Sequence, residues 1–196
     1  MKERDAPGAP DDELIRRTLG GDEDAFRELV ERYKSRAFGV VVGIVGSRDD
    51  ALDVVQESFV KAYYKLKDFR FGSNFYTWFY RLLVNQAIDR WRKTSRSGEV
   101  PLDEGWLSEE VTPPDSFAHP STPEKLLENR ELGEALQKAI AALPEHHRAV
   151  ILLREVEGMA YEDIAKTLGC SQGTVMSRLH YAREKLKAAL GRHMGG

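Results

Sequence analysis

The chain has 196 residues, of which 41% are hydrophobic, with a formal net charge of −3 and a pI near 6.0. This length suits one or two small domains, and the near-neutral total conceals blocks of opposite charge. The single cysteine excludes an intramolecular disulfide and a paired-cysteine metal site.

The N-terminal segment is charged and polar, so we expect no signal peptide and a cytoplasmic protein. The apolar run from Phe38 to Gly46 is far shorter than the roughly 20 residues that cross a bilayer, so no membrane insertion is expected. We interpret it as the buried end of a core helix that begins after a cap at Asp22. The glycines within it would permit close packing against a neighbouring element.

The next segment predicts an amphipathic helix that begins after an N-cap at Ser47, with Asp50 placed to complete a capping box. Spacings of three and four residues predict one buried stripe, formed by Leu52, Val55, Phe59, Ala62 and Leu66. Acidic and amide residues occupy the other faces: Asp49, Asp53, Gln56 and Glu57. Taken alone, these polar positions indicate no more than a solvated helix face.

Residues 61–96 are both basic and aromatic, with nine Lys and Arg against two Asp. Aromatic rings stack on unpaired bases for roughly 1–3 kcal/mol each, while cations follow the phosphates. Singly, each ring is better explained as core. The loop Arg70–Asn74 contains a glycine, a hydroxyl and an amide, and it could form a pocket for one extruded base. After it, Trp78, Arg81 and Asn85 share a helix face.

The order Asp53-x-x-Gln56-Glu57-x-Phe59, then Phe69, then Phe75-x-Thr77-Trp78-x-x-Arg81-x-x-x-Asn85 resembles region 2 of bacterial sigma factors, most closely the extracytoplasmic-function (ECF) group. The resemblance implies that the acidic helix binds the clamp helices of the largest RNA polymerase subunit. It also implies that the loop and the following helix capture a flipped base of the −10 element. Phe71 and Gly72 stand where the family usually has glycine directly after the Phe-Arg pair.

Two sets of site residues are therefore predicted. The predicted polymerase-binding residues are Asp49, Asp53, Gln56 and Glu57. The predicted residues for the melted −10 strand are Phe69, Arg70, Ser73, Asn74, Phe75, Trp78, Arg81 and Asn85.

The segment 97–123 is rich in proline and acidic residues and shows little periodicity, which indicates a flexible acidic linker. Alone, it indicates a solubilising tether. The family resemblance implies that such a connector passes through the RNA exit channel of the polymerase.

Residues 161–183 have the pattern of a helix-turn-helix, in which Gly169 ends the first helix and Ser171 caps the second. Val175, Leu179, Ala182, Leu186 and Leu190 form the expected buried stripe of that second helix. The outward side would enter the major groove or touch phosphates. The predicted DNA-binding residues are Gln172, Gly173, Thr174, Met176, Ser177, Arg178, His180 and Arg183, and the family resemblance implies that they read the −35 element.

The preceding stretch, Leu143-Pro144-Glu145-x-x-Arg148-x-Val150-x-x-Leu153 with Glu157-Gly158, resembles sigma region 4, which reads the −35 element. Many relatives carry a basic residue where this chain has Met176. Because methionine offers a base only apolar contact, the −35 preference should differ from theirs.

We therefore predict an all-α protein of two small helical domains: a region 2 domain (1–96), a linker (97–123) and a region 4 domain (124–196). It would bind RNA polymerase core and promoter DNA, and the resemblance implies control by an anti-sigma factor. No catalytic residue, cofactor or metal site is predicted. A conventional dimeric helix-turn-helix regulator remains the alternative, although it leaves the motifs of residues 53–85 unexplained.

Overall fold

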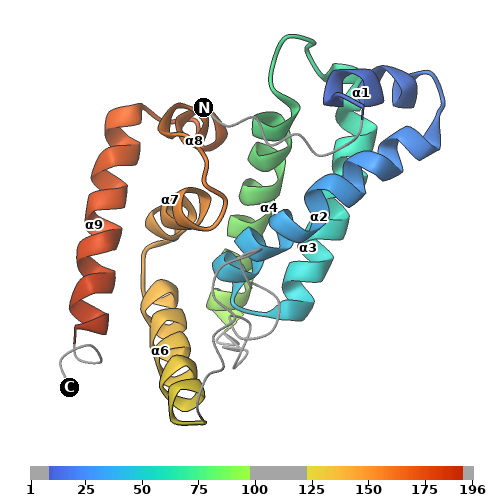
Figure 1. The fold of residues 1–196 in the computed structure, drawn as a ribbon. Helices are drawn as coiled ribbons and strands as arrows, with labels where there is room; N and C mark the ends of the chain where they lie inside the picture. Colours follow the sequence, from blue (N-terminus) through green and yellow to red (C-terminus); the bar gives the residue numbers. More distant parts are fainter. Residues whose placement is uncertain (1–8, 98–122, 192–196) are drawn as a thin grey trace.

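The computed structural model describes residues 9–97 and 123–191, and within these ranges the fold is all-α (Figure 1). Its only extended pairing there is an isolated bridge between Phe71 and Ser73. The helices are α1 (Asp11–Leu19), α2 (Glu23–Val45), α3 (Arg48–Lys65), η1 (Leu66–Asp68), α4 (Phe75–Ser97), α6 (Pro123–Ala141), α7 (Glu145–Glu155), α8 (Tyr161–Leu168) and α9 (Gln172–Leu190). None of the described helices is long and apolar enough to span a membrane.

Side-chain caps set the beginnings of three helices, as the sequence predicts. Asp22 accepts a hydrogen bond from the amide of Ala25 at the start of α2. Ser47 caps α3 in the same way, and Ser171 caps α9. Each cap satisfies an amide that has no partner within its own helix. The helix α1 was not predicted, although Pro10 and three acidic residues in its first turn are typical of a helix start.

In the N-terminal half, α2, α3 and α4 pack against one another around a cluster of aromatic rings. Phe79 lies near the centre, with its ring centroid 4.5 Å from that of Phe59 and 6.0 Å from that of Phe75. Val55, Phe59, Ala62 and Leu66 are buried as predicted. The prediction for Leu52 is wrong, because its side chain is 56% exposed. On α3 the buried row also includes Ala51, Val54 and Ser58, which turns Leu52 away from the core.

In the C-terminal half, α8 and α9 form the predicted helix-turn-helix and pack with α7. Gly169 ends α8 with a φ of 62°, a left-handed conformation that glycine adopts without steric cost. Ile164 and Ala165 of α8 and the first three residues of the predicted α9 stripe are buried. Leu186 and Leu190 are only half-buried, since they lie toward the free end of α9.

The two halves pack directly against each other, with α4 lying between α2–α3 on one side and α7–α8 on the other (Figure 1). Buried Arg148 of α7 donates a hydrogen bond of 2.7 Å to the carbonyl of Ile44 at the end of α2. Its guanidinium also lies 4.7 Å from the ring centroid of Trp91 of α4. Burial lowers the pKa of Arg148 to about 10, which leaves it charged at neutral pH.

Further contacts join the halves. The Tyr76 hydroxyl of α4 donates a hydrogen bond of 2.7 Å to buried Glu157, which also forms an ion pair with Arg36 of α2. Gly43 of α2 lets Leu152 of α7 approach so closely that a Cβ at this position would lie 2.7 Å from its methyl groups. The close glycine packing expected at the end of this helix is therefore present.

The predicted linker lies outside the described residues, apart from positions 97 and 123, which belong to α4 and α6.

Candidate functional site

The four predicted polymerase-binding residues follow the outer side of α3. Asp49, Asp53, Gln56 and Glu57 are all exposed, because the opposite side of α3 packs on α2 and α4. The structure therefore leaves all four side chains accessible to a partner.

A basic and an amide side chain from α4 contact the carboxylates of this helix. Arg90 donates hydrogen bonds of 3.0 Å to Asp50 and 3.4 Å to Glu57, and it lies 3.9 Å from a carboxylate oxygen of Asp53. Gln86 donates a hydrogen bond of 2.6 Å to the second oxygen of Glu57. Both oxygens of the Glu57 carboxylate are thus held from α4, and we refer to Gln86 and Arg90 together as the α4 clasp.

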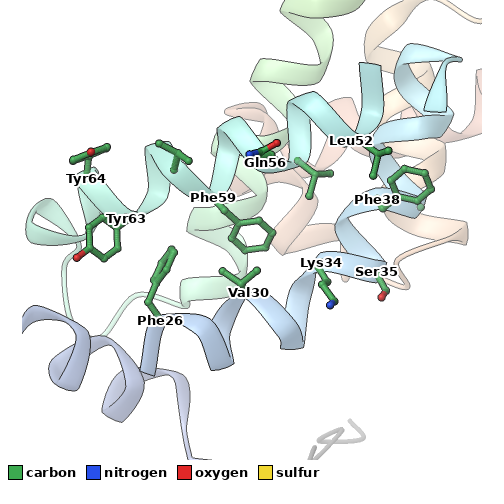
Figure 2. Close-up of a pocket in the computed structure, with 13 residues that line it drawn as sticks. Phe26, Val30, Lys34, Ser35, Phe38, Leu52, Gln56, Phe59, Tyr63 and Tyr64 are labelled. Carbon is green, nitrogen blue, oxygen red and sulfur yellow. The ribbon is translucent and has the colours of Figure 1, made fainter. Parts of the chain in front are cut away.

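An open apolar groove of about 1050 Å³ lies between α2 and α3, next to these polar residues. Figure 2 shows side chains from both helices directed into it. From α2 it is lined at every fourth residue by Phe26, Val30, Lys34 and Phe38, and from α3 by residues including Leu52, Gln56, Val60 and Tyr64. Tyr64 is 71% exposed, and Val60 and Leu52 are each more than half exposed.

This groove was not predicted from the sequence. A signal for it exists, because Leu52, Gln56, Val60 and Tyr64 recur at a spacing of four beside the row that forms the core. Two neighbouring, largely apolar rows on one helix indicate two packing partners, and among the described residues only the core row is covered. The same α3 helix therefore presents an exposed apolar row and an exposed acidic row.

The loop between η1 and α4 presents polar groups to solvent as expected. Arg70, Ser73 and Asn74 are exposed, and the Ser73 hydroxyl donates a hydrogen bond to the carbonyl of Arg70. Gly72 has a φ of 93°, which other residues rarely adopt, so the glycine sets the course of this loop. Phe71 is 45% exposed and stacks beneath the guanidinium of Arg16 of α1, 4.9 Å from its ring centroid. Neither residue belongs to the predicted set.

Of the residues predicted for the −10 strand, the aromatic ones are buried or half-buried and the polar ones are exposed. Phe69 and Phe75 are buried, and each contacts Trp78 in the aromatic cluster, with ring centroids 5.4 and 5.6 Å from it. Here their rings support the loop and present no open face for stacking on a base. Trp78 is half-buried, while Arg81 and Asn85 continue along the same face of α4 and are exposed.

The outward face of α9 is open over its first turns. Gln172, Gly173, Met176, Ser177 and His180 are exposed, as the helix-turn-helix pattern predicts. Thr174 and Arg178 are half-buried, and a guanidinium nitrogen of Arg178 lies 3.9 Å from the sulfur of Cys170. Arg183 forms an ion pair of 2.7 Å with Glu155, so it must exchange that partner to bind a phosphate. Among the described residues, no group of three His, Cys, Asp or Glu is placed to hold a metal ion.

Both halves of the chain match known protein families. Residues 29–97 match the model of Sigma-70 region 2, and residues 133–186 match that of Sigma-70 region 4. The chain is 41% identical over 180 residues to the ECF RNA polymerase sigma-E factor of Haemophilus influenzae, covering 90% of this chain and 93% of that one. It is 37% identical over 184 residues to the RNA polymerase sigma-H factor of Pseudomonas aeruginosa, covering 92% and 93%.

Two solved structures share the fold over most of the chain. CnrH in complex with the cytosolic domain of CnrY superimposes with a TM-score of 0.67 at 25% identity, covering 93% of this chain and 97% of that one. The sigma factor RpoE of Bartonella quintana, bound to the anti-sigma factor NepR, gives 0.62 at 27% identity, with coverages of 85% and 96%. A conventional helix-turn-helix regulator would not account for the match of residues 29–97 to region 2, so it is the poorer description of this chain. The chain belongs to the extracytoplasmic-function sigma factors, which are transcription initiation factors and not enzymes.

Proposed function

We propose that this chain binds RNA polymerase core, directs it to promoters and holds the melted −10 strand and the −35 duplex. In this proposal, residues 1–96 bind polymerase and the −10 element, residues 97–123 connect the two domains, and residues 124–196 read the −35 element. The proposal rests on α3, where exposed acidic residues lie beside an apolar groove that the described residues leave open.

The chemistry of this surface fits a helical partner that carries both apolar and basic residues. The walls of the groove are two rows of side chains, one on α2 and one on α3, that recur at every fourth residue. Helix-in-groove recognition uses apolar anchors in such a groove. Asp53 and Glu57 at its edge would attract cations and fix the register of the partner. The clamp helices of the largest polymerase subunit are the partner that we assign to this surface.

The loop before α4 and the face of α4 offer a route for single-stranded DNA. Arg70, Ser73 and Asn74 would hold one extruded base, while Arg81 and Asn85 would contact the strand beyond it. Phe69, Phe75 and Trp78 would set the shape of that pocket from behind. Binding only the unpaired base shifts the duplex toward the open form by the difference in affinity.

Reading both promoter elements requires the two halves to separate. The centres of a −35 and a −10 element lie about 25 base pairs apart, or roughly 85 Å at 3.4 Å per base pair. A compact chain of this length has a radius of gyration of roughly 16 Å, equivalent to a sphere about 42 Å across. We infer that polymerase binding opens the packing of α7 and α8 against α2 and α4, and holds each half over its own element.

An anti-sigma factor is the proposed regulator. The support is that both similar solved structures contain a partner chain, named as an anti-sigma factor in the Bartonella quintana complex. A regulator that covered the groove or stabilised the closed packing would withhold the chain from polymerase.

The test is run-off transcription with purified bacterial core polymerase, using fragments of DNA from upstream of the coding gene. We expect discrete transcripts only when the chain is present, with start sites that locate the −10 and −35 elements. A chain that neither co-elutes with core nor directs transcription from any fragment would contradict the proposal. A matched variant lacking Gln56 and Glu57 should lose transcription at limiting core and retain its fold.

A further inference from the structure

The α4 clasp connects the proposed polymerase-docking surface on α3 to α4, the helix proposed to contact the −10 strand. Arg90 lies on α4, five residues after Asn85, and reaches across to three carboxylates of α3. Its side chain is 28% exposed, whereas the Glu57 carboxylate that it contacts is 56% exposed. The partly buried guanidinium of Arg90 thus binds a Glu57 carboxylate that remains accessible to a partner.

The geometry is that of a positioning device. Arg90 binds one oxygen of Glu57 and Gln86 binds the other, so the carboxylate is fixed in one orientation from beneath. Gln86 is itself placed by the buried hydroxyl of Ser58, 3.5 Å away. A carboxylate oxygen has two lone pairs, so Glu57 can still accept hydrogen bonds from a partner on its exposed side.

We propose that Arg90 and Gln86 preset the docking carboxylates Glu57 and Asp53, so that polymerase core meets them already ordered. This inference rests on the proposed docking function and names residues on α4 as part of it. Ordering a long acidic side chain on binding costs affinity, and a side chain that is ordered beforehand avoids most of that cost. Arginine suits the role because its planar fork contacts several carboxylates at once, which a lysine ammonium does not reproduce.

A purely structural role for the clasp is the competing explanation. The α3–α4 packing already rests on the stacked rings of Phe59 and Phe79 and on buried Ser58. Ion pairs as exposed as Arg90–Glu57 contribute little to folding stability. Removing Arg90 should therefore change polymerase affinity more than it changes the stability of the fold.

A double-mutant cycle on the full chain separates these roles. The dissociation constant for purified core polymerase is measured, without DNA, for the unaltered chain, R90A, D53A/E57A and the triple variant R90A/D53A/E57A. We expect R90A to weaken binding roughly five- to tenfold in the unaltered background and less than twofold when both acids are absent, because it acts through them. R90K should recover less than half of the loss on a logarithmic scale.

The control is R17A, which removes an arginine–aspartate pair from the α1–α2 turn and should leave the affinity within twofold. Equal affinity of R90A and the unaltered chain would overturn the positioning role while the docking function stands. An equal loss from R90A in both backgrounds, accompanied by a lower unfolding midpoint, would assign Arg90 to folding alone. If the unaltered chain did not bind core, the docking function would fail and the positioning role with it.

Discussion

At the level of single residues, exposure separates groups that can contact DNA from groups that shape the site. Trp78, Arg81 and Asn85 share one face of α4, yet Trp78 is half-buried against Phe69 and Phe75 while the other two are open. Hydrogen-bonding groups that point to solvent are free to recognise a base edge. Asn85 is therefore the residue of this face best suited to test for base capture.

We expect N85A to slow promoter opening without changing core affinity. Losing one or two hydrogen bonds to an unpaired base costs about 1 kcal/mol, which is a several-fold effect. Permanganate reactivity of the −10 thymines, followed over time at saturating core, measures opening directly. Q56A is the reciprocal control, because it should lower core affinity and leave opening normal at saturating core. Unchanged permanganate kinetics for N85A would remove Asn85 from the site.

At the level of helices, small residues determine how closely α2 and α7 approach. A Cβ at Gly43 would lie 2.7 Å from both methyl groups of Leu152 and 3.3 Å from its Cγ. Leu152 is 2% exposed, so its whole side chain would have to move within a packed core. At Gly39 the nearest atom to a Cβ is the Cγ1 of Val156, at an ordinary contact distance of 3.7 Å.

These two glycines on one helix form a matched pair for measurement. G43A should be less stable than G39A by about 1–3 kcal/mol, the usual cost of overpacking, because both variants gain the same helix propensity and that gain cancels in the comparison. G39A should be neutral or slightly stabilised, since it gains that propensity without a clash. Urea unfolding of both variants gives the comparison. Equal stabilities would show that Leu152 relaxes without cost.

At the level of the whole molecule, buried Glu157 is a carboxylate in the packing between the halves. Burial raises its pKa above the ordinary value of 4.5, and the Tyr76 hydrogen bond and the Arg36 ion pair offset only part of that effect. A carboxyl whose pKa is raised by folding binds its proton more tightly in the folded state. Its contribution to stability is complete below pH 4.5 and is lost as pH rises through the folded pKa.

Because folding raises the pKa of Glu157, the free energy of unfolding should depend on pH differently in the unaltered chain and in E157Q, which has no titrating group at this position. As pH rises from 4.5 toward neutrality, the free energy of unfolding of the unaltered chain should fall relative to that of E157Q, and the difference should then level off. Urea unfolding of both proteins at several pH values isolates this one group, because the other titrations cancel in the difference. A difference that does not vary with pH would mean that Glu157 titrates as it does in the unfolded chain.

Local signals in the sequence predicted most of the helices and the exposed candidate residues. The caps at Asp22, Ser47 and Ser171, the glycine end of α8 and the open face of α9 depend on residues within one or two turns of each other. Helical periodicity and capping act over that same short range, so a single sequence is sufficient to predict them. The family resemblance followed from the order of motifs along the chain.

Which helix faces are covered depends on the packing of the helices and could not be predicted from the sequence. Leu52 fits the core row by spacing but lies in the groove, because α2 and α4 leave that side of α3 free. The hold of Arg90 on Glu57 joins residues 33 positions apart, and the bond from Arg148 to Ile44 joins residues 104 positions apart. No local pattern encodes such pairs, since they exist only once the helices have packed. Local sequence patterns thus predicted most of the helices and the family. The packing of α2, α3 and α4 produced the groove and the clasp, and the packing of the two halves produced the closed arrangement.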